Sequence, residues 1–157
     1  MKIDRYSVVL VNPEIPPNTG NIMRLCANTN CSMHIIKPLG FELDDKSVKR
    51  AGMDYLKNIR VTSYENISEF KRKNNFKRFF LVSKYGNKNY AEITYKLGDC
   101  FIFGSESKGL SRSTLELFKG CEKIFIPMAS GSRSINLANS VAIVLYEAYR
   151  QNNFQFL

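Results

Sequence analysis

A regular alternation of short apolar runs with helix-forming segments constrains this chain most. The runs lie at 7–11 (SVVLV), 33–36 (MHII), 59–62 (IRVT), 78–83 (RFFLVS), 100–103 (CFIF) and 123–127 (KIFIP). Short, continuous apolar strands that alternate with helices are typical of a parallel sheet covered on both faces. We therefore expect an α/β fold, with a mostly parallel sheet flanked by helices, and one domain over residues 1–157.

Helix signals lie between most of these runs. The predicted helices start at Asn18 or Thr19, after Asp44 or Asp45, at a capping box of Ser113 and Glu116 within 111–118, and after Ser134. The last helix has the clearest pattern, since its apolar residues recur at helical spacing and form one stripe. The members of that stripe are Leu137, Val141, Val144, Leu145 and Ala148.

The chain is strongly basic. Its 23 Lys and Arg residues exceed its 14 Asp and Glu residues, for a net charge of +9, and the densest cluster is KRKNNFKR at 71–78. Such a surplus favours a polyanionic partner such as nucleic acid. A cluster that is only a solvated helix end is the alternative.

Composition also limits the compartment and the chemistry. No apolar stretch approaches the ~20 residues that span a membrane, and the start MKIDRYS lacks a secretion signal, so we expect a cytoplasmic protein without membrane contact. Cys26, Cys31, Cys100 and Cys121 match no metal-binding spacing, which predicts reduced thiols and no metal. His34 has no nucleophile in a motif beside it and is predicted to be a packed side chain.

Ligands of such sheets bind at the carboxyl ends of the strands, so the loops after strands are informative. In FGSESKGLS at 103–111, Gly104 and Gly109 have the spacing of a Walker A loop, but Leu110 stands where the phosphate-binding lysine is required. This excludes a P-loop hydrolase. The backbone of a glycine-bounded loop can approach a ligand closely, and Glu106 suits a small, partly cationic ligand. An ordinary strand–helix turn is the alternative.

A second loop, PMASGSRSINLANSVA at 127–142, leads into the last helix. Pro127 ends the strand, and Ser134 is the expected N-cap, which leaves backbone N–H groups facing the strand ends. Asn136 and Asn139 are weak helix formers in the first turns and indicate polar contacts.

The first loop, NPEIPPNTGNIMRLCAN at 12–28, is stiffened by prolines that fix φ. It ends in an apolar helical stretch that contains one cation, Arg24. A cation among apolar residues is costly if it is buried without a partner. Arg24 is therefore expected to face water, a partner or a ligand anion, with an intramolecular salt bridge as the alternative.

Together these loops resemble motifs 1, 2 and 3 of the SPOUT methyltransferases. The matching segments are PPNTGNIMR, FGSESKGL and IPMASGSRSINLANSVAIVLYEAYRQ. More narrowly, the chain resembles the small tRNA 2′-O-methyltransferases that modify the wobble cytidine or uridine. That likeness extends over most of the chain and includes RLCANT, HIIKPLGF and RAGMDY.

The resemblance implies a C-terminal trefoil knot, S-adenosylmethionine as methyl donor with S-adenosylhomocysteine as product, and a homodimer whose active sites use both subunits. It assigns Arg24 as catalytic and Asn18 and Arg133 as substrate contacts. The cofactor contacts that it implies are Val82, Ser83, Gly104, Glu106, Gly109, Ile126, Met128, Ser134, Asn136 and Leu137. Since a guanidinium stays protonated, Arg24 is expected to stabilise the developing alkoxide and not to act as a base.

The expected reaction is methyl transfer to the ribose of tRNA nucleotide 34, within the anticodon stem-loop. Two alternatives stay open. The first is a related SPOUT enzyme that acts on another tRNA or rRNA position, and the second is an RNA-binding protein with this fold but without catalysis.

Overall fold

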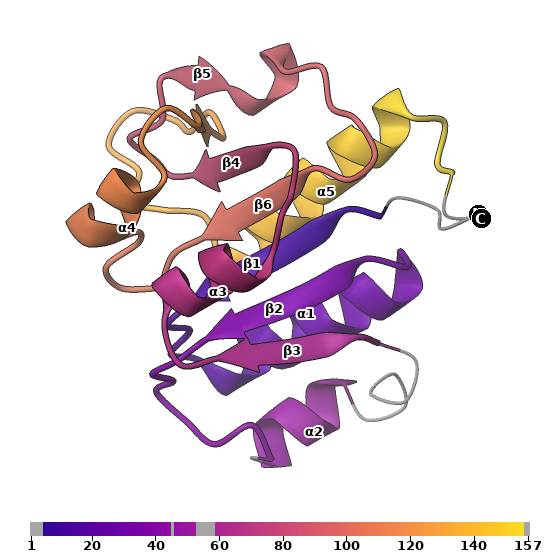
Figure 1. Cartoon of the computed structure of the whole chain (residues 1–157), viewed down its shortest axis with the longest axis vertical. Helices are drawn as coiled ribbons and strands as arrows, with labels where there is room; N and C mark the ends of the chain where they lie inside the picture. The colour runs from indigo at the N-terminus through magenta and orange to yellow at the C-terminus, as the bar shows by residue number, and fades with distance from the viewer. Residues whose placement is uncertain (1–4, 45, 53–58, 156–157) are drawn as a thin grey trace.

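The computed structural model describes residues 5–44, 46–52 and 59–155. Its strands are β1 (Ser7–Val11), β2 (Ser32–Ile36), β3 (Val61–Tyr64), β4 (Phe79–Val82), β5 (Lys88–Asn89), β6 (Cys100–Phe103) and β7 (Glu122–Phe125). Its helices are α1 (Pro16–Asn28), α2 (Lys46–Gly52), α3 (Ile67–Lys73), α4 (Arg112–Leu117) and α5 (Leu137–Gln151), with a 3₁₀ turn η1 at Tyr90–Glu92. Figure 1 shows the strands running side by side with helices in front of and behind them.

The strands form one seven-stranded sheet in the order β3-β2-β1-β6-β4-β7-β5, and every pairing among the described strands is parallel. This confirms the predicted α/β fold with a parallel sheet. Two details differ. β3 lies at 61–64, two residues beyond the run at 59–62, because Met33 pairs with Val61. β5 carries no apolar run and was not predicted; it is held by pairing with β7.

Alternate residues of each central strand face opposite sides of the sheet, as the period of a strand requires. In β1, Val8 and Leu10 join a core cluster with α1 and α5, while Val9 and Val11 join a second cluster with α3 and the end of α4. α3 therefore lies in front of the sheet in Figure 1, and α1 and α5 lie behind it. Burial on both faces explains why the strands are continuous apolar runs.

The predicted apolar stripe of the last helix is confirmed. Val141, Val144, Leu145 and Ala148 are buried, and Leu137 is partly buried against the same cluster.

Hydrogen bonds tie the C-terminal half of α5 to the start of the chain. Tyr6 Oη donates to the Ala148 carbonyl over 3.0 Å, and Tyr149 Oη donates to the Thr29 carbonyl over 2.7 Å. Asn152 Nδ2 in turn donates to Tyr6 Oη over 2.7 Å. The C-terminal half of α5 is therefore attached both to the residue before β1 and to the residue after α1.

Helix boundaries agree less well with the caps that the sequence predicts. α4 is capped by Ser111, whose Oγ accepts from Thr114 N, and not by Ser113. α3, capped by Asn66, follows β3 without a predicted cap. α2 begins at Lys46 as expected, but Asp45 and residues 53–55 of the RAGMDY segment lie outside the described residues.

Candidate active site

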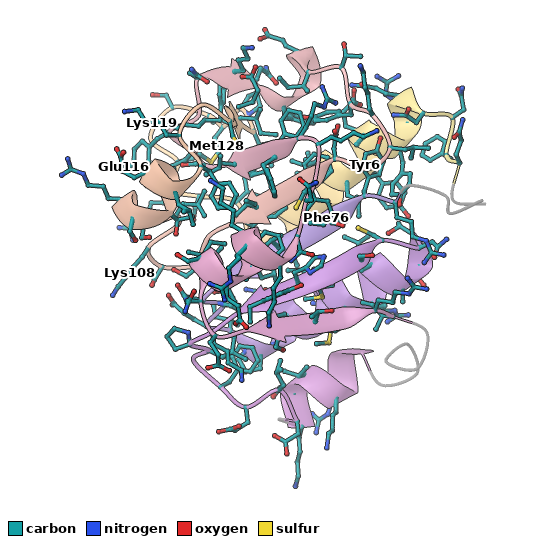
Figure 2. All side chains as sticks on the ribbon, viewed as in Figure 1. Tyr6, Phe76, Lys108, Glu116, Lys119 and Met128 are labelled. Atoms are coloured by element: carbon teal, nitrogen blue, oxygen red, sulfur yellow. The ribbon has the colours of Figure 1, made fainter. Side chains whose placement is uncertain are left out.

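A cavity of about 910 Å³ opens at the carboxyl ends of β4, β6 and β7. Twelve of the thirteen site residues named from the sequence line it, and they come from loops that are far apart in the chain. They are Asn18, Val82, Ser83, Gly104, Glu106, Gly109, Ile126, Met128, Arg133, Ser134, Asn136 and Leu137. In Figure 2, Lys108 and Met128 lie on this side of the molecule, where the arrowheads of the strands end.

The start of α1 forms one wall and is capped from outside its own segment. Its N-cap residue, Ile15, has no side-chain hydrogen bond, and Pro16 and Pro17 occupy the next positions. Proline carries no N–H, so these two residues need no capping acceptor. The Glu106 carboxylate instead accepts from Glu14 N over 2.8 Å and from Ile15 N over 3.0 Å. A carboxylate at a helix N-terminus is favoured by the helix dipole.

Asn18 connects all three loops. Its Nδ2 donates to Glu106 over 3.3 Å, and its Oδ1 accepts from Asn136 Nδ2 over 3.0 Å. Asn136 Oδ1 then accepts from Asn139 N and caps α5. Two predicted caps are therefore wrong: Asn18 lies inside α1 as a bridge, and α5 is capped by Asn136 and not by Ser134, because the chain turns helical two residues later than expected.

The loop after β6 folds back on itself. Ser105 and Gly109 exchange backbone hydrogen bonds of 3.3 and 2.9 Å, and Gly109 has a φ of 65°. A Cβ on Gly104 would lie 2.0 Å from the Gly109 carbonyl carbon, so only glycine fits there. Ser107 Oγ donates to the Glu14 carboxylate over 2.7 Å, which lowers the pKa of Glu14. The loops of motifs 1 and 2 are thus joined to each other.

The lining is strongly cationic. Lys84, Lys108, Lys123 and Arg133 contribute to it, and we call these four residues the cationic rim. Their side chains form no hydrogen bond or ion pair with the residues that the structure describes. Among the described residues, Glu106 is the one carboxylate that lines the cavity, and its oxygens already accept from the backbone that precedes α1. The cationic rim therefore favours an anionic partner.

Sequence reasoning missed Lys84, Tyr85, Lys108 and Lys123 as lining residues. The loop 83–90 follows a strand and belongs to the set in which ligand contacts are expected. Its SKYGN segment, with one cation and one aromatic residue before a glycine, is the signal that was available.

Arg24 is the exception among the predicted residues. It is exposed on α1 and is not among the residues that line the cavity. It is held by an interaction within the chain. The cavity of a single chain therefore does not bring Arg24 together with the other predicted site residues.

The remaining candidates for chemistry lie in the core. His34 is buried, with its Nδ1 3.0 Å from Tyr64 Oη, and burial lowers its pKa to about 4, in agreement with a packed side chain. Cys26, Cys31 and Cys100 are buried free thiols. Within residues 5–44, 46–52 and 59–155, no cluster of His, Cys, Asp or Glu is arranged to hold a metal.

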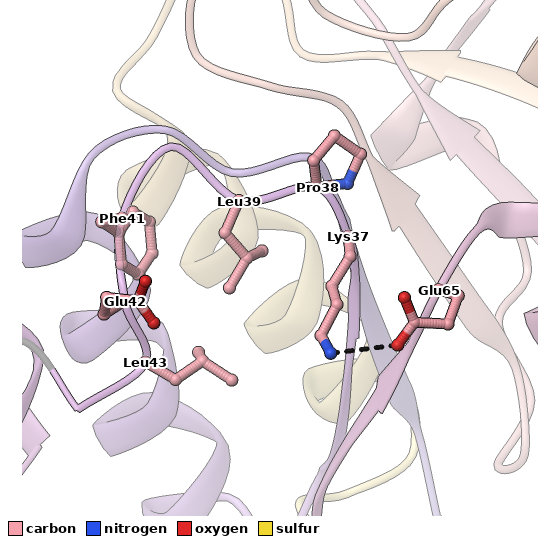
Figure 3. Close-up of a pocket in the computed structure, with 7 residues that line it drawn as sticks. All are labelled: Lys37, Pro38, Leu39, Phe41, Glu42, Leu43 and Glu65. Carbon is pink, nitrogen blue, oxygen red and sulfur yellow. Dashed lines mark hydrogen bonds and ion pairs between the residues drawn. The ribbon is translucent and has the colours of Figure 1, made fainter.

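A second hollow of about 490 Å³ lies beyond β2 (Figure 3). It is lined by Lys37, Pro38, Leu39, Phe41, Glu42, Leu43 and Glu65. Its one cation, Lys37, is paired with Glu65 over 3.1 Å, and Glu42 adds a second carboxylate. This hollow therefore lacks the excess positive charge of the larger cavity.

Among the described helices, none is long and apolar enough to cross a membrane.

Comparison with known proteins agrees with this geometry. A tRNA (cytidine(34)-2′-O)-methyltransferase from Escherichia coli K12 is 46% identical over 145 residues, which are 92% of each chain. A solved structure described as "Structural insights into the 2-OH methylation of C/U34 on tRNA" has a TM-score of 0.90 and 36% identity, over 96% of this chain and 97% of that one.

A third similarity concerns the fold alone. The SpoU methyltransferase AviRb from Streptomyces viridochromogenes, solved with AdoMet, is 21% identical with a TM-score of 0.86, over 98% of this chain and 62% of that one. The sequence model of the SpoU rRNA Methylase family matches residues 5–146. With this match over most of its length, the chain belongs to the SpoU methylase family, whose members include RNA 2′-O-methyltransferases.

Proposed function

We propose that this protein transfers a methyl group from S-adenosylmethionine to the ribose 2′-oxygen of nucleotide 34, a cytidine or uridine, in tRNA. One observation carries the proposal: residues of all three motifs meet in one cavity at the strand ends. The E. coli relative that is 46% identical over nearly its whole length carries this activity in its name.

The cavity fits S-adenosylmethionine chemically. Apolar side chains, among them Leu110, Ile126 and Leu137, suit the adenine ring, while the hydroxyl groups of Ser83 and Ser134 suit the polar parts. The fold back of the motif 2 loop at Gly104 and Gly109 shapes one wall. When bound, the cofactor supplies an electrophilic methyl group on a sulfonium. That group needs an aligned 2′-oxygen, whose hydroxyl proton would pass to solvent water, so positioning by the protein carries most of the catalysis.

Glu106 serves this site indirectly in our proposal. Its carboxylate is already committed to the start of α1 and to Asn18. It therefore joins the loop before α1, which faces the substrate in our proposal, to the loop after β6, which faces the cofactor. The neighbours of Glu106 then make the direct contacts with the cofactor.

The position of Arg24 supports a site shared between two chains. Arg24 is exposed and lies outside the cavity of its own chain, so in a homodimer it would act at the cavity of the partner subunit. There a guanidinium, which stays protonated, would hold a phosphate or the 2′-oxygen and stabilise the developing alkoxide.

The substrate proposal extends to the anticodon stem-loop, with Asn18 and Arg133 as contacts. The cationic rim suits the phosphates of such a loop. We further propose that residues 1–157 act as one domain in the cytoplasm and that the C-terminal segment forms the trefoil knot of SPOUT proteins.

Labelled S-adenosylmethionine and purified tRNA test the function. We expect label in an alkali-resistant dinucleotide that contains nucleotide 34, and none when that nucleotide is replaced by its 2′-deoxy form. Label at another position would contradict the wobble assignment. Absence of label with all tRNA and rRNA substrates would contradict catalysis.

Mixed dimers test the shared site. Arg24→Ala and Asn136→Ala subunits, each inactive alone, should regain activity when they are unfolded and refolded together, since one site then receives Arg24 and Asn136 intact. No regained activity in a verified mixed dimer would refute a shared site. Near wild-type turnover of Arg24→Lys, with an unshifted pH profile, would argue against a geometric role for the guanidinium.

A further inference from the structure

The turn after β4 carries the most exposed large apolar side chain among the described residues. Tyr85 is 82% exposed, against 45% for Ile15 and 43% for Tyr146. A single exposed aromatic ring is common on a protein surface, so the surroundings of Tyr85 decide whether it has a role outside folding.

The backbone of this turn is fixed on both sides. Ser83 N donates to the Ile124 carbonyl and Asn87 N to the Lys123 carbonyl, each over 3.0 Å, so both ends are attached to β7. Within the turn, Gly86 N donates to the Ser83 carbonyl over 2.9 Å, and Tyr85 N donates to Ser83 Oγ over 3.2 Å.

Gly86 holds the turn against the neighbouring strand. A Cβ at this position would lie 2.4 Å from the Ile124 carbonyl carbon. Only glycine therefore permits this close approach. The exposed position of Tyr85 thus follows from an anchored backbone and not from a loose loop.

Tyr85 also lies at the site. It lines the same cavity as Ser83 and Arg133, and Lys84 Nζ lies 5.1 Å from the centre of its ring. Lys123 lines the cavity as well. An exposed aromatic ring next to one cation, in a cavity lined by others, is the combination that binds single-stranded nucleic acid, since bases stack on the ring and phosphates contact the cations.

We propose that Tyr85 is a stacking platform for an unpaired base of the RNA substrate, and that Lys84 contacts the adjacent phosphate. This inference rests on the proposed function, because it takes RNA as the substrate. It adds a substrate-binding turn, residues 83–86, at the cavity.

Binding of a fluorescently labelled tRNA, measured by anisotropy without methyl transfer, tests the proposal. Tyr85→Ala should raise the Kd for tRNA about 5- to 100-fold, the effect of losing one stacked base, while Tyr85→Phe keeps it within about twofold of wild type. The Kd for S-adenosylmethionine, measured by calorimetry, should be the same in all three proteins.

Salt dependence separates stacking from charge. Tyr85→Ala should leave the slope of log Kd against log salt unchanged, whereas Lys84→Ala should reduce it by about 0.7, the value for one contact to single-stranded RNA. Lys96→Ala, which removes an exposed cation before β6 at the opposite edge of the sheet, is the control and should change neither quantity.

Three results would overturn the proposal: wild-type affinity of Tyr85→Ala, a Tyr85→Phe variant as weak as Tyr85→Ala, or an equal loss of S-adenosylmethionine binding. The methylation map is a separate readout. A wild-type protein that methylates a different nucleotide would contradict the wobble assignment, while the affinities of the Tyr85 variants for the same tRNA would still decide the stacking role.

Discussion

Two cationic regions of this molecule differ in what their side chains contact. In the segment 71–78, Lys73 is paired with Glu69 over 2.6 Å and Arg78 with Asp99 over 2.5 Å, while Lys71 donates to the carbonyl of Leu117. The cationic rim, in contrast, forms no ion pair with the described residues and faces the cavity. The segment that is richest in charge is therefore largely occupied by contacts within the protein.

The difference shows that charge density along the sequence is a poor guide to charge that is available for a ligand. The cations at 71–78 adjoin one another in the chain, yet three of the five hold α3, α4 and β6 in place. The rim cations come one at a time from loops after different strands, and the parallel sheet brings them together. We expect substitutions of Lys71, Lys73 and Arg78 to change stability, and substitutions at the rim to change RNA binding.

Arg78→Ala should have the largest effect on stability. Arg78 contacts the buried carboxylate of Asp99 through Nε at 2.8 Å and through Nη2. Removal of one partner leaves a buried charge without compensation, which costs about 3 kcal/mol and should lower Tm by roughly 10 °C in calorimetry.

Arg72→Ala is the matched control. Arg72 is an exposed cation of the same segment and should stay within about 0.5 kcal/mol of wild type. Equal stability of the two variants would contradict a structural role for Arg78.

The next effect is a pH-dependent stability that comes from His34, on the side of the sheet that α3 covers. His34, whose pKa is lowered to about 4, contacts the rings of Phe70 and Phe76. In the unfolded chain its pKa is about 6.5, so below pH 6.5 the unfolded state binds a proton that the folded state refuses. The contribution of His34 to the free energy of unfolding is fully present above pH 6.5. It decreases as the pH is lowered and is smaller by about 2 kcal/mol at pH 5.

Urea unfolding at pH 7 and pH 5 measures this loss. His34→Gln lacks the titrating group and should show a loss smaller by about 2 kcal/mol. Since His34 is the only histidine in the chain, its NMR titration gives the pKa directly. A titration near pH 6.5 in the folded protein would contradict the account.

A smaller effect is expected where the two loops meet at the cavity. Glu106→Gln removes the charge that accepts from the start of α1 and should destabilise the protein by about 1 kcal/mol. It should also weaken S-adenosylmethionine binding, because the loop positions shift. Glu116→Gln, on the exposed side of α4 (Figure 2), should change neither. Unchanged cofactor affinity in Glu106→Gln would contradict the claim that Glu106 positions the cofactor site by joining the loop before α1 to the loop after β6.

The parallel sheet and half of the residues that line the cavity could be predicted from the sequence. Apolar runs such as 8–11 and 100–103 are unambiguous, because burial on both faces leaves few polar positions in the strand. The predicted site residues came from the resemblance of three loops after strands to the SPOUT motifs, and the sheet topology brings such loops to one edge.

The long-range partners could not be predicted. Nothing local to Glu106 indicates that it caps α1, 91 residues away, and Asn18 resembles a helix cap because Asn is a common one. The exposure of Tyr85 depends on how close Gly86 comes to β7, which is a tertiary contact. The trefoil knot remains a prediction of the family resemblance.

The most direct test of the central claim compares two double variants in tRNA binding. Lys108→Ala with Arg133→Ala removes two rim cations, and Arg72→Ala with Lys77→Ala removes two exposed cations of the segment 71–78. The first pair should reduce the slope of log Kd against log salt by about 1.4 and weaken binding about 10- to 100-fold at ~0.1 M salt, while the second leaves both unchanged. An equal or larger loss in the second pair would contradict the claim that the cavity rim is the surface that binds RNA.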